Sequence, residues 1–141
     1  MIADAADAPV MVVHLTNRKA FEEVMRARMN GQKVYAETCP QYLLLDDSVY
    51  SKPDFEGAKY VCAPPIRKKA DQDCLWKALA NDQIQTVATD QCSFTMEQKA
   101  LGKDDFTKIP GGCREYRREE LCFIHTVYAQ AGSRRNRCAV C

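Results

Sequence analysis

The hydrophobic pattern of the first part of the chain alternates between short apolar runs and longer amphipathic stretches. The run from Pro9 to Leu15 is continuous and rich in valine, which predicts a strand covered on both faces, as in a parallel sheet. Thr16 or Asn17 can cap the amphipathic stretch that follows, and Asn30-Gly31 can end it. The pattern therefore opens with a strand followed by a helix.

Two more strands are predicted in the middle of the chain. Residues 33–37 form the first, and Cys39-Pro40 then opens a loop or short helix that runs to Leu45. Residues 58–62 form the second, which Pro64-Pro65 cannot continue.

The next amphipathic stretch predicts a helix that Asp71 or Asp73 can cap. Its apolar face carries Leu75, Trp76 and Leu79. Asn81-Asp82 ends this helix before a strand over residues 84–89. Strands and helices that alternate at these lengths predict an α/β fold of parallel strands joined by right-handed crossovers.

Composition and charge narrow the class of protein. Hydrophobic residues make up 46% of the 141 residues, and Lys and Arg exceed Asp and Glu by one. This composition is typical of a globular protein, and the balanced charge disfavours nucleic acid and anionic membranes as partners. Every apolar stretch is far shorter than the roughly 20 residues that span a bilayer, and the first residues do not resemble a secretory signal. We therefore expect a cytoplasmic protein whose partner is a small molecule or another protein.

Eight cysteines are unevenly spaced along the chain, and without a secretory signal we interpret them as buried or idle thiols. The segment 113–141 holds several of them among scattered arginines, and helical spacing is visible there over residues 121–129. An alternative is a structural zinc site formed by Cys138 and Cys141 with Cys113 or Cys122.

His14 and Asp90 each follow a predicted strand. The carboxyl ends of parallel strands share one face of an α/β barrel, where active sites lie. A neutral imidazole and a carboxylate suit zinc or another divalent metal, and a carboxylate beside an activated water can accept its proton. The spacing alone also allows a buried histidine and an aspartate that caps a helix.

The sequence around these residues resembles the D-hydantoinase and dihydropyrimidinase family in order and spacing. The resemblance covers nearly all of residues 1–112 and rests on several independent motifs, which makes it specific. The motifs are Val13-His14-Leu15-Thr16, Tyr35-Ala36-Glu37-Thr38-Cys39-Pro40-Gln41-Tyr42-Leu43, Ala88-Thr89-Asp90-Gln91-Cys92-Ser93-Phe94 and the stretch from Gln98 to Pro110.

The resemblance implies the later strands of a TIM-type (β/α)₈ barrel, that is, a fragment from the C-terminal half of the enzyme. It implies that a metal-bound hydroxide hydrolyses the ring amide of hydantoins and dihydropyrimidines at a two-metal, zinc-type centre. His14 falls on a ligand of one metal, and Asp90 falls on the aspartate that binds the other metal and handles the proton. Main-chain groups at Ala63 and Gly111 fall where the family binds the cyclic amide.

The resemblance also sets a limit on activity. The family's other ligands, a His-X-His pair, a carboxylated lysine and a further histidine, are expected on strands before Met1. We therefore divide the chain into a partial barrel over residues 1–112 and a divergent tail over residues 113–141, and expect the isolated chain to be inactive. The family implies a homo-oligomer. An alternative function is a non-catalytic module that associates with a full-length homologue or with a complementary N-terminal fragment.

Overall fold

The computed structural model describes residues 2–90 and 92–113 of the chain. The predicted helix over residues 121–129 and all of the tail except Cys113 lie outside these residues. No helix in the described part has the length and apolar character needed to cross a membrane.

The centre of the fold is a parallel sheet of three strands in the order β1-β2-β3. The strands are β1 (Val10–Val12), β2 (Val34–Thr38) and β3 (Thr86–Val87). In the register, Val10 faces Val34 and Thr38 faces Val87, and both pairings are parallel. The predicted α/β fold with parallel strands is confirmed, although each outer strand is shorter than predicted.

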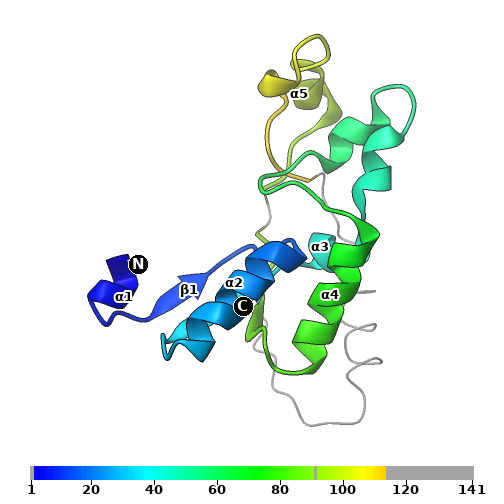
Figure 1. Ribbon diagram of the computed structural model, residues 1–141. Coiled ribbons are helices and arrows are strands. Elements are labelled where there is room, and N and C mark those ends of the chain that lie inside the picture. Colours follow the sequence, from blue (N-terminus) through cyan, green and yellow to red (C-terminus); the bar gives the residue numbers. More distant parts are fainter. Residues whose placement is uncertain (1, 91, 114–141) are drawn as a thin grey trace.

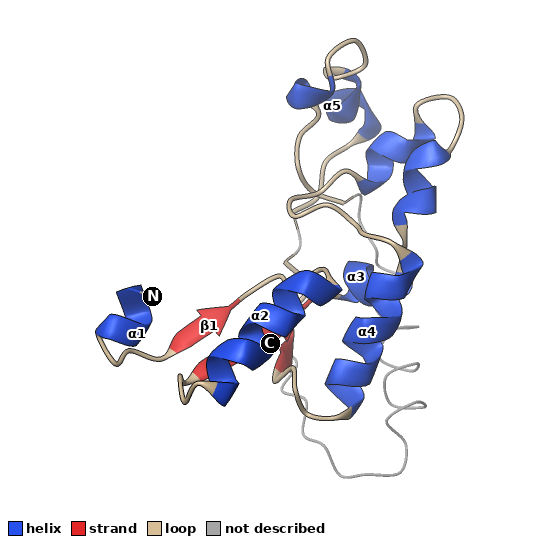
Figure 2. Cartoon of the chain, viewed as in Figure 1, coloured by secondary structure: helices blue, strands red, loops and turns tan. Residues whose placement is uncertain are grey.

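Two long helices cover one face of this sheet (Figures 1 and 2). They are α2 (Arg18–Met29) and α4 (Lys69–Ala80). The buried core lies between them and the strands, and the least exposed apolar members of that core are Leu15, Ala36, Cys39, Leu43, Leu75 and Ala78.

The other face of the sheet is open within the described residues. Met11 on β1 stands directly opposite Tyr35 on β2, and these side chains are 43% and 50% exposed. The prediction that the strand at Pro9–Leu15 is covered on both faces is therefore wrong for this chain. The apolar residues of this run predicted burial, but no described segment covers the face of the sheet that carries Met11 and Tyr35.

The predicted helix caps were correct for α2 and wrong for α4. Asn17 Oδ1 accepts a hydrogen bond of 2.9 Å from the amide of Ala20, which satisfies one of the free amides in the first turn of α2. The N-cap of α4 is Lys68, which makes no capping bond. Asp71 instead accepts a hydrogen bond of 2.9 Å from the amide of Arg18, so that it caps α2 from the neighbouring helix.

The remaining elements are short, and one of them corrects a predicted strand. They are α1 (Ile2–Ala5), α3 (Pro40–Leu44), η1 (Asp47–Ser51), η2 (Glu56–Tyr60), α5 (Met96–Ala100) and η3 (Phe106–Lys108), where η marks a 3₁₀ helix. The strand predicted over residues 58–62 is wrong, because most of it lies in η2. The carbonyl of Val61 accepts hydrogen bonds from Gly112 and Lys99 rather than from a neighbouring strand, so this run packs partly buried without joining the sheet.

Candidate functional site

His14 and Asp90 meet at the carboxyl edge of the sheet. His14 follows β1 and Asp90 follows β3, on opposite sides of the central strand. The distance from His14 Nε2 to Asp90 Oδ2 is 3.4 Å. Both residues have left-handed backbones, with φ of 54° and 46°. That conformation is uncommon outside glycine and is found at functional sites, where the surrounding structure holds it in place.

The end of β2 holds the two residues together. The hydroxyl of Thr38, which is fully buried, donates a hydrogen bond of 2.7 Å to the carbonyl of Leu15, the residue after His14. The carbonyl of Thr38 accepts a bond of 3.1 Å from the amide of Ala88, near Asp90. One residue of the central strand therefore binds both of the segments that carry the site.

The two side chains fit part of a metal centre. An imidazole nitrogen and a carboxylate oxygen are ordinary zinc ligands, and both side chains reach solvent, with 29% and 42% of their surfaces exposed. In residues 2–90 and 92–113, no three or more His, Cys, Asp or Glu side chains gather closely enough to hold a metal ion. The described residues thus provide a pair of ligands, and a closed site needs more.

A small pocket beside this pair contains three of the four predicted site residues. Its lining includes Asp90, Ala63 and Gly111, but His14 is not part of it. Ala63 and Gly111 are far apart in sequence, yet a Cβ built on Gly111 would lie 3.7 Å from the Cβ of Ala63. The two predicted main-chain positions therefore face each other in one wall.

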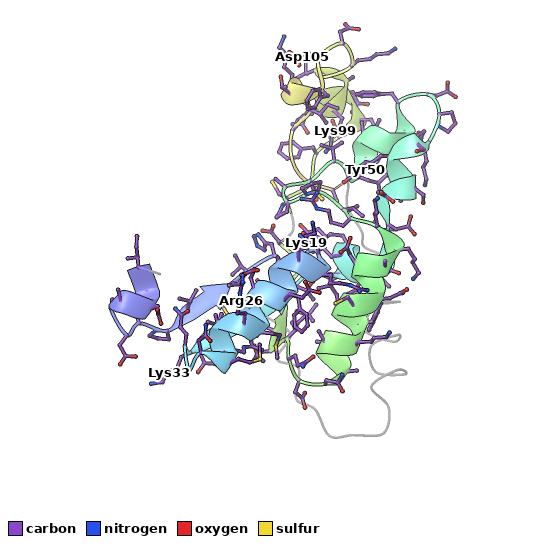
Figure 3. The ribbon with its side chains drawn as sticks, viewed as in Figure 1. Lys19, Arg26, Lys33, Tyr50, Lys99 and Asp105 are labelled. Atoms are coloured by element: carbon purple, nitrogen blue, oxygen red, sulfur yellow. The ribbon has the colours of Figure 1, made fainter. Side chains whose placement is uncertain are left out.

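Lys99 binds two segments of this wall to each other, a role that was not predicted from the sequence. Its ammonium group is fully buried and donates hydrogen bonds of 2.8 Å to the carbonyl of Val61 and 2.7 Å to that of Pro110. Burial lowers the pKa of Lys99. Figure 3 labels it on α5, above the sheet. The motif from Gln98 to Pro110 contained this lysine, but nothing local indicated that its charge would be buried.

Several protonated groups surround the pocket. Burial, with smaller effects from Asp90 and Glu37, raises the pKa of the Cys39 thiol to about 12. A hydrogen bond with the Cys113 thiol, together with burial, raises the pKa of Cys62. Burial also raises the pKa of Tyr42, whose hydroxyl donates a bond of 3.0 Å to the carbonyl of Pro64. These groups are protonated at physiological pH and do not act as nucleophiles in the proposed hydrolytic site.

Within the described part of the chain, no disulfide joins any two of the five cysteines there, namely Cys39, Cys62, Cys74, Cys92 and Cys113. Cys122, Cys138 and Cys141 lie outside the described residues. The alternative zinc site that depends on them therefore stays a prediction.

The fold and the site together define a class: an α/β protein that gathers an imidazole and a carboxylate at the carboxyl edge of a parallel sheet. Comparison with known proteins names the family. The chain is 52% identical over 112 residues to the D-hydantoinase of Geobacillus stearothermophilus and 48% identical over 112 residues to that of Streptomyces coelicolor. Each match covers 79% of this chain and 24% of the relative. This chain is a homologue of the D-hydantoinase and dihydropyrimidinase family, and spans about a quarter of the length of those relatives.

Solved structures agree with this assignment. The chain superimposes on the crystal structure of dihydropyrimidinase from Brevibacillus agri with a TM-score of 0.78 and 52% identity, covering 80% of this chain and 25% of that one. A D-hydantoinase structure gives a TM-score of 0.85 at 41% identity, covering 92% and 28%. No family model matches the chain.

Proposed function

We propose that this chain forms the His14 and Asp90 side of the active site of a cyclic amidohydrolase that opens hydantoin or dihydropyrimidine rings. The observation that carries the proposal is the distance of 3.4 Å between His14 Nε2 and Asp90 Oδ2, which come from two different strands. The homology supports it, because the relatives named above are D-hydantoinases and a dihydropyrimidinase. In this proposal, the three strands are the later part of a (β/α)₈ barrel.

Each residue has a separate role in the proposal. His14 and Asp90 would be ligands of a divalent metal, and their imidazole and carboxylate donors suit zinc. When bound, such a cation would supply Lewis acidity and an activated water. Asp90 would also hold a proton during the reaction, because a carboxylate oxygen can accept one. The main-chain groups of Ala63 and Gly111 bind the amide and carbonyl groups of the ring. Backbone groups keep this capacity whatever side chain they carry.

The isolated chain is proposed to be inactive. Two donors do not form the closed ligand set of a metal centre, and the described residues offer no third. Pure chain supplied with zinc should therefore leave hydantoin and dihydrouracil intact. Ring opening by the chain alone would contradict this part of the proposal. It can be measured as a loss of the ultraviolet absorbance of dihydrouracil.

The activity itself is tested in a chimera. Residues 1–112 of this chain would replace the matching segment of the Geobacillus stearothermophilus D-hydantoinase, which supplies the rest of the protein. We expect the chimera to open hydantoin, and expect Asp90→Asn to reduce its kcat by about a hundredfold or more, because the proton acceptor and a metal ligand are both lost. His14→Asn should lower the zinc content measured by elemental analysis. Ala63→Ser, which keeps the main chain, is the matched control and should retain activity.

A chimera that melts cooperatively and retains zinc but opens neither ring would refute the proposal. If the Asp90→Asn chimera kept its full rate, Asp90 would be neither the proton acceptor nor a needed metal ligand. The family assignment would be unaffected.

A second candidate function is an interaction module. The open face of the sheet favours it, because Met11 and Tyr35, which pair across β1 and β2, are 43% and 50% exposed, and Val13 is 50% exposed. In this alternative, the chain would associate with a full-length homologue or with a complementary N-terminal fragment. Co-purification of the chain with a homologous hydantoinase, and its loss in a Met11→Lys variant, would support this function over the catalytic one.

A further inference from the structure

Two thiols lie side by side in the wall of the pocket and take no part in the proposed hydrolysis. Cys62 and Cys113 both line the pocket, and the Cys113 thiol contributes to the raised pKa of Cys62. Cys62 Sγ also lies 3.3 Å from the carbonyl of Pro64, and Cys113 Sγ lies 3.9 Å from that of Tyr60. The pair thus joins two segments, which we call the 60–64 segment and the 109–113 segment.

The backbone already holds these segments against each other. The amide of Gly112 donates a hydrogen bond of 3.0 Å to the carbonyl of Val61, one residue away from each cysteine. The ammonium group of Lys99 bridges the same carbonyl to that of Pro110. Bringing the two sulfur atoms into bonding contact therefore requires side-chain rotation rather than a new encounter of distant segments.

We propose that Cys62 and Cys113 form a reversible dithiol–disulfide pair that cross-links the two segments of the pocket wall when the chain meets a small-molecule disulfide. Cys62 is the more exposed of the two and reacts first. Its thiol first loses its proton to the solvent, and the thiolate then attacks the external disulfide, forms a mixed disulfide and releases one small thiolate, which takes up a proton. The sulfur of Cys113 then displaces the second small thiol. The protein loses two protons and two electrons, and the reagent is reduced to two thiols.

Cys92 is a third thiol in the same pocket that could form a disulfide with Cys62 or Cys113, so the proposal must say which pair forms. It lines the same pocket and is exposed, so it meets an external disulfide more readily than either member of the pair. In the folded chain, however, the hydrogen bond from the amide of Gly112 to the carbonyl of Val61 holds the neighbours of Cys62 and Cys113 together. We therefore expect Cys92 to end as a mixed disulfide with the reagent, and Cys62 to end bonded to Cys113.

The test is a map of disulfide linkages in the full chain. The purified chain would be incubated with oxidised glutathione, alkylated, digested with trypsin without reduction and analysed by mass spectrometry. Trypsin separates the three thiols into different peptides, since it cleaves after Lys59, Arg67, Lys77, Lys99, Lys108 and Arg114. We expect the peptide pair 60–67 and 109–114 to be the main linkage of either cysteine, and to be at least about tenfold more abundant than in chain oxidised in urea, where a long loop must close first.

Two variants control the result. Cys92→Ser should leave the linkage intact, while Cys113→Ser should abolish it and leave Cys62 either alkylated or as a mixed disulfide. Reduction with dithiothreitol should restore both thiols. The proposal is overturned if wild-type chain links Cys62 or Cys113 mainly to another cysteine, or if both remain alkylated after oxidation. The wild-type map decides this even if Cys113→Ser does not fold, and its outcome does not depend on the proposed hydrolase activity.

Discussion

The hydroxyl of Thr38 donates a hydrogen bond of 2.7 Å to the main-chain carbonyl of Leu15, in a place where both residues are buried. This bond secures the chain immediately after His14, and it is made by a residue of the neighbouring strand. The amide of Leu15 donates a hydrogen bond of 2.8 Å to the main-chain carbonyl of Glu37, so the hydroxyl of Thr38 adds a side-chain bond to a backbone bond between the same segments. Together the two bonds satisfy both main-chain polar groups of Leu15.

Replacing Thr38 by valine should destabilise the chain by about 1–3 kcal/mol, because the carbonyl of Leu15 would be left buried without a donor. Thr38→Ser keeps the hydroxyl and loses one methyl group, which costs about 1 kcal/mol. Urea unfolding followed by the fluorescence of Trp76, the one tryptophan of the chain, measures both. If the valine variant proved as stable as the serine variant, the hydrogen bond would not be what secures this segment.

The two neighbouring glycines of the pocket wall should respond differently to alanine. A Cβ on Gly112 would lie 2.1 Å from the carbonyl oxygen of Cys92, so the backbone must move, whereas a Cβ on Gly111 meets no atom closer than 3.7 Å. We expect Gly112→Ala to cost about 1–3 kcal/mol and Gly111→Ala to stay within about 0.5 kcal/mol of the wild type. Thermal melting by circular dichroism separates them. Equal melting temperatures would show that the wall can relax around the added methyl group.

Arg28 connects α2 to β2 and to the segment that precedes β3, and lysine should not replace it. Its guanidinium donates bonds of 2.7 Å to the carbonyls of Val34 and Gln83 and to Gln85 Oε1. A lysine ammonium cannot reproduce this planar arrangement, so Arg28→Lys should lower the free energy of unfolding by about 1–3 kcal/mol.

Arg26→Lys is the matched control for that prediction. Arg26 lies on the same helix and pairs with Glu23, with both side chains 64% exposed. Exposed ion pairs contribute little, so we expect a change of at most about 0.5 kcal/mol. A loss of stability as large as that of Arg28→Lys would mean that α2 is sensitive to any loss of arginine.

The stability of the chain should fall in alkaline solution, and Cys39 should contribute to the fall. The folded chain keeps the Cys39 thiol protonated because burial raises its pKa from 9.0 to about 12. The unfolded thiol ionises first, so the unfolded state binds fewer protons between these values. The contribution of Cys39 is complete below pH 9 and is lost as the pH rises towards 12, at a rate of at most about 1.4 kcal/mol per pH unit.

Urea unfolding at several pH values, under reducing conditions, measures this slope. Cys39→Ala should be less stable than the wild type at neutral pH, but should lose less stability on going to alkaline pH. Cys92→Ser changes an exposed cysteine and should keep the wild-type slope. Parallel slopes for wild type and Cys39→Ala would remove Cys39 from the explanation.

Local features of the sequence determined most of the secondary structure. Asn17 was predicted as a possible cap of α2 because a side chain and an amide three residues apart can meet in any context. The failures came where partners are distant. Asp71 has the chemistry of a cap, yet it caps α2 rather than its own helix. The apolar run at residues 58–62 has the composition of a strand, but its carbonyl at Val61 is used by Lys99 and Gly112.

The sequence by itself determined that His14 and Asp90 would lie at one edge of the sheet, because parallel strands end on the same side and each residue follows a strand. Tertiary structure decided that their side chains come within 3.4 Å, that Ala63 faces Gly111, and that a charged lysine is buried between Val61 and Pro110. Caps and strand propensities act over a few residues, whereas burial and hydrogen-bond partners depend on which distant segments pack together.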